Sequence, residues 1–276
     1  MLIGAMNHPT HDVLGEIEWM AGMRLGFIDL TLEPPAAASW KLDPAAVRDA
    51  LQHHGLKVVG HTAFYLPVAS AFEEVRKGAV AELRRCIEVF AAVGVAWMNI
   101  HPDRYTPMHD RAFYLQRNIK SLRELIDYGA ERGVSLMIEN LPGDFNTPAQ
   151  LGELLDPLPR LGLHLDIGHA NLMLQHNSTQ AILETYGNRL RHVHLHDNAG
   201  GHADLHLPLG AGNVDVPWAV RALKGCGYDG TITLEVFSPD RRHLEYSRDL
   251  LRRVWNETEA PASSRACTEE ATSGVR

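Results

Sequence analysis

The sequence has few cysteines and no long apolar run. Its 276 residues include only Cys86, Cys226 and Cys267, an odd and scattered set that fits a reducing cytoplasm better than a disulfide framework. No apolar stretch approaches the roughly 18–20 residues that cross a bilayer. The first residues, MLIGAMNHP, lack the basic and apolar segments of a signal peptide. We therefore expect a cytoplasmic protein without a membrane partner.

An excess of positive charge is also missing. Lys and Arg number 26 against 34 Asp and Glu, a formal net charge of −8, which makes nucleic acid an unfavoured partner without excluding it. Gly210-Ala211-Gly212 follows no strand directly, so we expect no nucleotide cofactor. Histidine, in contrast, is abundant at 16 residues. It is the commonest metal ligand and the natural acid or base near neutral pH, so its placement matters most.

Short β-like runs alternate with amphipathic helical stretches along the chain. The expected strands are 2–6, 26–32, 56–62, 95–101, 134–139, 161–166, 190–197 and 230–236. Between the third and fourth, apolar residues from Phe72 to Phe90 recur at steps of three and four and stop at Gly94, which predicts one helix. Such alternation predicts a (β/α)8 TIM barrel, with an open doubly wound sheet as the alternative.

We expect one domain, residues 1–256. Residues 257–276 contain few large apolar side chains, which predicts a short disordered C-terminal tail.

Residues able to bind metal stand at the ends of six successive expected strands. In chain order they are His61, His101, Glu139, Asp166, His194 and Glu235. Active sites of such barrels lie at the carboxyl ends of the strands, so these side chains are expected at one rim. Mixed imidazole and carboxylate ligands suit Zn²⁺, Mn²⁺, Fe²⁺ or Co²⁺ better than Ca²⁺.

Three further residues belong to the same rim. His169 follows Asp166 by three residues, and the loop after the seventh strand carries Asp204 and His206, whose spacing of two places them on one side of an extended segment. Within the seventh strand His192, His194 and His196 share a face, which we expect to point into the barrel.

Several motifs resemble those of the xylose isomerase-like barrel superfamily, which includes sugar isomerases and epimerases as well as endonuclease IV-type AP endonucleases. They are GHTAFYLP (60–67), NIHPD (99–103), IENLP (138–142), LDIGHAN (165–171), HVHLHDN (192–198), DLHLPLGAGNVD (204–215) and TLEVF (233–237). The resemblance covers residues 1–256.

For the epimerase branch, the resemblance implies a single Mn, Co, Mg or Zn ion bound by Glu139, Asp166, His194 and Glu235. Glu139 and Glu235 would also transfer protons through an enediolate, with His169 polarising an oxygen. The residues expected to contact the sugar or sugar phosphate are His61, His101, Asn140, His196 and Arg241. Arg241 is included because it follows the eighth strand at a helix start, where barrels often bind phosphate.

The endonuclease branch uses the same four positions and adds ligands for two more ions: His61 and His101, then His169, Asp204 and His206. All these residue types are present, so a multinuclear phosphodiesterase remains the alternative function. The opening MLIGAMNHP lacks the expected Gly-Gly loop, and no arginine-rich, aromatic DNA-penetrating loop is evident. A non-catalytic binding barrel is a further alternative. Self-association through outer helices is expected only by analogy with similar barrels.

Overall fold

Eight strands alternate with eight α-helices in the computed structural model, which describes residues 1–104 and 108–260. The strands are β1 (Leu2–Met6), β2 (Phe27–Leu32), β3 (Lys57–Thr62), β4 (Trp97–Ile100), β5 (Ser135–Glu139), β6 (Gly162–Asp166), β7 (Leu190–Leu195) and β8 (Thr231–Leu234). The helices are α1 (Val13–Gly22), α2 (Pro44–His54), α3 (Glu73–Val93), α4 (Arg111–Ala130), α5 (Pro148–Leu155), α6 (Thr179–Tyr186), α7 (Val216–Gly225) and α8 (Arg242–Glu257).

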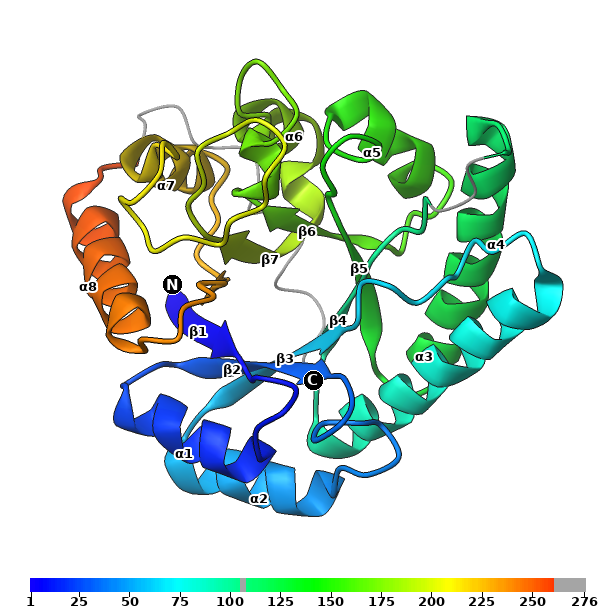
Figure 1. Cartoon of the computed structure of the whole chain (residues 1–276), viewed down its shortest axis with the longest axis horizontal. Coiled ribbons are helices and arrows are strands. Elements are labelled where there is room, and N and C mark those ends of the chain that lie inside the picture. Colours follow the sequence, from blue (N-terminus) through cyan, green and yellow to red (C-terminus); the bar gives the residue numbers. More distant parts are fainter. Residues whose placement is uncertain (105–107, 261–276) are drawn as a thin grey trace, which may run out of the picture.

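The strands form one closed parallel barrel. Each pairs with its neighbour in the sequence, and β1 pairs with β8 through Leu2 and Thr231, Ile3 and Ile232, and Gly4 and Thr233. Figure 1 shows the strands in the middle of the molecule with the helices around them. The predicted TIM barrel is therefore confirmed, and the open doubly wound sheet is excluded.

Local sequence signals set the helix boundaries. Asp43 and Asp110 accept hydrogen bonds from backbone N–H groups in the first turns of α2 and α4. Gly94 ends α3 with a φ of 97°, a left-handed conformation that glycine adopts without steric cost. From Ala79 onward the predicted apolar stripe is buried on α3, with Leu83 and Phe90 fully buried against the barrel, but Phe72 precedes the helix and is exposed.

The barrel interior changes from apolar to polar along the strands. Phe27, Val59 and Met137 form a small apolar cluster, and a Cβ atom at Gly4 would lie 2.6 Å from the Phe27 ring. Two residues later on the same strands come Asp29, His61 and Glu139. Because side chains alternate along a strand, these residues share the interior face with the apolar cluster. Since all strands run in one direction, the polar ends meet at one rim.

Helix α8 includes Glu257, the first residue of the expected tail, and residues 261–276 of that tail lie outside the described residues. Among the helices described, none combines the length and apolarity needed to cross a membrane.

Candidate metal and catalytic site

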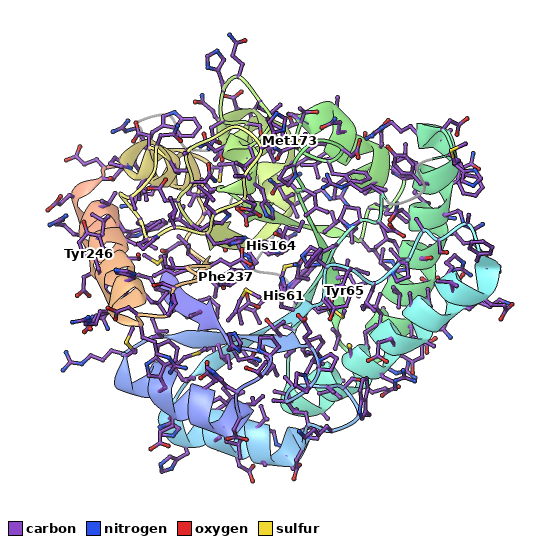
Figure 2. All side chains as sticks on the ribbon, viewed as in Figure 1. His61, Tyr65, His164, Met173, Phe237 and Tyr246 are labelled. Atoms are coloured by element: carbon purple, nitrogen blue, oxygen red, sulfur yellow. The ribbon has the colours of Figure 1, made fainter. Side chains whose placement is uncertain are left out.

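The predicted strand-end residues converge on a cavity of about 1120 Å³ at the carboxyl ends of the strands. Those that line it are His61, His101, Glu139, His169, Asp204, His206, Glu235 and Arg241. Asp166 and His194 are fully buried beside them. Figure 2 shows His61 near the middle of the barrel, with His164 close by in this view.

Asp166 connects two groups of candidate ligands. With Glu139 and His169 it forms one cluster of close ligand atoms, and with His196 and Glu235 it forms another. Its Oδ2 atom lies 4.0 Å from Nδ1 of His194, which is itself 3.1 Å from Oε2 of Glu235. Although buried, this Oδ2 has no hydrogen-bond partner among the described residues. The arrangement therefore directs a free carboxylate oxygen toward the other candidate ligands.

The buried carboxylates require nearby positive charge. Burial alone would raise the pKa of Glu139 and of Asp166, but neighbouring histidines hold both pKa values well below the ordinary range. Conversely, burial would lower the pKa of His169 and of His194, yet the carboxylates around them raise both well above the usual value. In the metal-free protein, the positive charge of protonated His169 and His194 therefore balances the negative charge of the carboxylates.

Asp29 fixes the orientation of His194. Its Oδ2 atom lies 2.7 Å from Nε2 of His194 and accepts a hydrogen bond of 2.8 Å from the Thr233 hydroxyl. His192 contributes Nε2 at 3.3 Å. Burial would raise the pKa of Asp29, but these two histidines hold it well below its ordinary value, so Asp29 is a carboxylate. His194 therefore donates through Nε2 and directs Nδ1 toward Asp166 and Glu235.

A further cluster lies around Asp204 in the loop after β7. Oδ2 of Asp204 is 3.0 Å from Nε2 of His169 and 3.1 Å from Nε2 of His206, and Oδ1 is 3.5 Å from Nε2 of His196. Despite its burial, contacts with Asp204 and Glu235 raise the pKa of His206 to about 9. The loop residues thus reach the barrel rim, where Asp204 and His206 both face His169 and His206 also faces Glu235.

His61 and His101 approach Oε2 of Glu139, whereas His169 approaches Oε1. Nε2 of His101 lies 2.9 Å from Oε2 of Glu139, and Nε2 of His61 lies 3.9 Å from the same atom. Burial lowers the pKa of His101, the larger effect, while Glu139 opposes it. The candidate ligands for additional ions therefore gather in groups around the same rim.

Two predicted substrate contacts do not face the cavity. Asn140 follows the strand-end Glu139 by one residue, so it projects away from the barrel axis. It accepts a 2.7 Å hydrogen bond from the backbone N–H of Asp166 and donates to the Asp166 carbonyl. His196 is fully buried and packs on Gly168, where a Cβ atom would lie 2.2 Å from its Nε2. In this geometry Asn140 supports Asp166 and its loop, whereas Nε2 of His196 lies among the candidate ligands, 3.4 Å from Oδ1 of Asp166 and 3.5 Å from Oδ1 of Asp204.

The sequence reasoning missed Asp29 and His164 as site residues. Both carried the signal of strand alternation, since Asp29 lies between Phe27 and Thr31 on one face and His164 precedes Asp166 by two residues. His164 is fully buried, with Nδ1 3.3 Å from Oε2 of Glu139, and neither ring nitrogen has a hydrogen-bond partner among the described residues. Burial holds its pKa well below the ordinary value, which keeps the ring neutral beneath the rim.

Comparison with known proteins gives the same fold and a consistent set of relatives. The family described as "Xylose isomerase-like TIM barrel" matches residues 18–254. An uncharacterised protein of Methanocaldococcus jannaschii is 27% identical over 267 residues, covering 85% of this chain and 90% of the relative. A ketose 3-epimerase of Arthrobacter globiformis is 27% identical over 243 residues, covering 83% and 81%.

Solved structures extend the likeness. A D-tagatose 3-epimerase-like protein superimposes with a TM-score of 0.80 at 25% identity, covering 93% of this chain and 97% of that one. A 3-keto-D-glucoside 4-epimerase of E. coli superimposes with a TM-score of 0.76 at 21% identity, covering 92% and 99%, a likeness that concerns the fold. Sugar epimerases thus recur among the relatives and the structural neighbours.

Proposed function

The chain belongs to the xylose isomerase-like TIM barrel family, and from this premise we propose that it is a divalent-metal-dependent ketose epimerase acting at the carbon next to the ketone. One observation carries the proposal: Glu139 at the end of β5 and Glu235 directly after β8 line the same cavity from strands three positions apart. Two carboxylates facing one substrate can remove a proton from one side and return it from the other.

The residues at the rim fit a divalent cation. Glu139, Asp166, His194 and Glu235 offer three carboxylates and one imidazole, and the unpartnered Oδ2 of Asp166 supports a ligand in their midst. Hard carboxylate and borderline imidazole donors suit Mn²⁺, Co²⁺, Mg²⁺ or Zn²⁺. Such an ion would polarise the substrate ketone and stabilise negative charge on its oxygen. It would also replace the charge that His169 and His194 carry as protons.

The protein's own residues perform the proton transfer. One glutamate takes the proton from C3 of the ketose, and the electron pair moves onto the carbonyl oxygen to give an enediolate. The other glutamate then gives a proton to the opposite face of C3, which inverts that carbon and restores the ketone. His169 lies between Glu139 and Asp204, and its Nε2 donates to a substrate oxygen that takes the place of Asp204. His61 and His101 contact the sugar beside Glu139.

Isotope exchange in D₂O tests this assignment. In wild-type protein, both C3 epimers of a ketose should acquire deuterium at C3. Glu139→Gln and Glu235→Gln should each lower epimerisation by at least about 10²-fold, the lower range for general acid–base catalysis. Each variant should also keep exchange for one epimer alone, since one base remains. Retained metal, measured by mass spectrometry, separates loss of the base from loss of the ion.

The histidine clusters support a second candidate, a multinuclear phosphodiesterase. His61 and His101 lie by Glu139, and His169 and His206 lie by Asp204, so each pair shares a carboxylate on the rim. Several ions placed there would activate water and neutralise a leaving oxygen. This candidate requires two or three metals per chain and cleavage of abasic DNA, whereas the epimerase requires one metal and no cleavage.

A further inference from the structure

The cavity extends well past the candidate metal ligands. Its volume of about 1120 Å³ is larger than the roughly 300–1,000 Å³ typical of pockets that enclose drug-sized ligands. A free ketohexose would fill only part of it. The remainder reaches between the loop after β1, helix α1 and the start of α8. We name this part, lined by His8, His11, Glu16, Trp19 and Arg241, the outer lobe.

Arg241 is held in place at the outer lobe. Its guanidinium carbon lies 3.8 Å from the centre of the Trp19 ring, and Nη2 donates to Oε1 of Glu16 at 2.5 Å. The Glu16 carboxylate is nearly fully buried and also contacts Nδ1 of His11 at 3.1 Å. The Arg241 side chain is 41% exposed, and among the described residues only Nη2 has hydrogen-bond partners. Nε and Nη1 are therefore positioned to donate to a ligand.

The charge of this lobe does not favour a phosphate. Glu16 balances Arg241, and the neighbouring Asp240 is itself a lining residue. Hydrogen bonds from Arg242 lower the pKa of Asp240 to about 2, so it is an anion. Its Oδ1 accepts the backbone N–H of Arg242, one of the amides that a phosphate at the start of α8 would use. The carboxylates of Asp240 and Glu16 would repel a dianion, whereas hydroxyl groups can pair with these donors and acceptors.

An exposed aromatic ring stands in the same cavity. Phe237 is 60% exposed and stacks on His206, with ring centres 4.3 Å apart. In Figure 2 it lies between α8 and His61. Its backbone N–H donates to the His206 carbonyl at 3.1 Å, which restrains the ring further. An exposed, supported aromatic face suits the C–H face of a sugar ring, and polar groups on either side suit its hydroxyls.

From these features we propose that the outer lobe binds a neutral second sugar unit attached to the ketose, so that the preferred substrate is a glycosylated ketose. The inference rests on the proposed epimerase function and specifies its substrate class. The ketose end lies between Glu139 and Glu235. The attached sugar packs on Phe237, and its hydroxyls accept hydrogen bonds from Arg241.

Turnover of paired ketoses by the Mn²⁺-loaded protein tests this. Isomaltulose and lactulose carry a second sugar on fructose, free fructose carries none, and fructose 6-phosphate carries a dianion. Wild type should favour isomaltulose or lactulose over fructose by about tenfold or more in kcat/KM. Arg241→Lys keeps a positive charge beside Glu16 but loses the planar guanidinium group with its several donors. It should lower kcat/KM for that disaccharide about tenfold. It should lower the value for fructose less than the value for the disaccharide.

Arg253→Lys is the matched control, because Arg253 is exposed on α8 and does not line the cavity. It should leave the preference unchanged, and calorimetric binding of isomaltulose and fructose should show the same pattern without turnover. Equal use of fructose and the disaccharides, or equal losses in Arg241→Lys, overturns the second-sugar site and leaves the epimerase intact. Preference for fructose 6-phosphate that depends on Arg241 also overturns it. Absence of C3 exchange in every ketose overturns the epimerase proposal itself.

Discussion

Replacing Asp29 with Asn tests how the barrel prepares His194 for a metal ion. Asp29 is a buried carboxylate whose Oδ2 accepts from Nε2 of His194 at 2.7 Å and from Thr233 at 2.8 Å. An Asn side chain has one acceptor oxygen and one amide donor. Because His194 and Thr233 both contact the same atom, Oδ2, an Asn oxygen at that position still accepts from both, and the amide takes the place of the unpartnered Oδ1. The neutral amide, however, makes Nδ1 of His194, the atom that faces Asp166 and Glu235, a less basic metal ligand than the Asp29 carboxylate does.

The expected loss is 10–100-fold in metal affinity, the range for partners that orient a ligating histidine. That range corresponds to about 1.4–2.7 kcal/mol, since each tenfold change is about 1.4 kcal/mol. Calorimetric titration of the metal-free protein with Mn²⁺ or Co²⁺ measures it directly. Thr233→Val is the matched control, because it removes another hydrogen bond to Asp29 but leaves the acceptor for His194.

We expect both variants to lose stability, but only Asp29→Asn to lose metal affinity substantially. Thermal unfolding of the metal-free forms gives the stability comparison. Wild-type affinity in Asp29→Asn, or equal affinity losses in the two variants, would refute the orienting role.

Three further outcomes follow from the site. Metal affinity should rise with pH, because His169 and His194 have raised pKa values and must release their protons when the ion binds. We expect up to a tenfold rise per pH unit for each proton displaced, measured by Co²⁺ titration between pH 6 and 9. A pH-independent affinity would count against ligation by His194. Conversely, the metal-free protein should lose stability as pH rises from about 6.5 to about 9, since the raised pKa of His206 stabilises the fold only while the ring is protonated; its melting temperature reports this. Gly168→Ala should lower the free energy of unfolding by about 1–3 kcal/mol, because the new methyl group would overlap the buried His196 ring. A denaturant midpoint equal to that of wild type would show that the ring moves aside without cost.

The strand order and most rim residues were predictable from the alternation of strands and helices along the chain. Alternating βα units define a barrel, and the parallel strands of a barrel must end at one rim. Glu139, Asp166 and Glu235 were therefore identified at strand ends, and the structure places all three at the rim.

Proximity to a strand-end residue in the sequence did not indicate which way a side chain points. Asn140, one of the expected substrate contacts, follows Glu139 immediately, and successive side chains leave a strand on opposite sides. It instead donates to the Asp166 carbonyl of the neighbouring strand at 2.9 Å. His196 has the correct parity, yet the Gly168 backbone and Asp204 enclose it, and those contacts join segments distant in sequence.

Asp29 was overlooked for a related reason. In the run GFIDLTL a single carboxylate is weak evidence of a site, and its importance depends on His192 and His194, more than 160 positions later. Only closure of the barrel brings β2 opposite β7. The outer lobe likewise depends on packing between α1 and the start of α8, which strand and helix periodicity does not determine.

Deuterium incorporation at C3 tests the central claim most directly. The metal-loaded protein is incubated in D₂O with fructose, isomaltulose and lactulose, and the recovered sugars are examined by NMR. We predict deuterium at C3, formation of the C3 epimer, and loss of both when the metal is chelated. No deuterium in any ketose, together with two or three metals per chain and cleavage of abasic DNA, would contradict the epimerase and favour the phosphodiesterase.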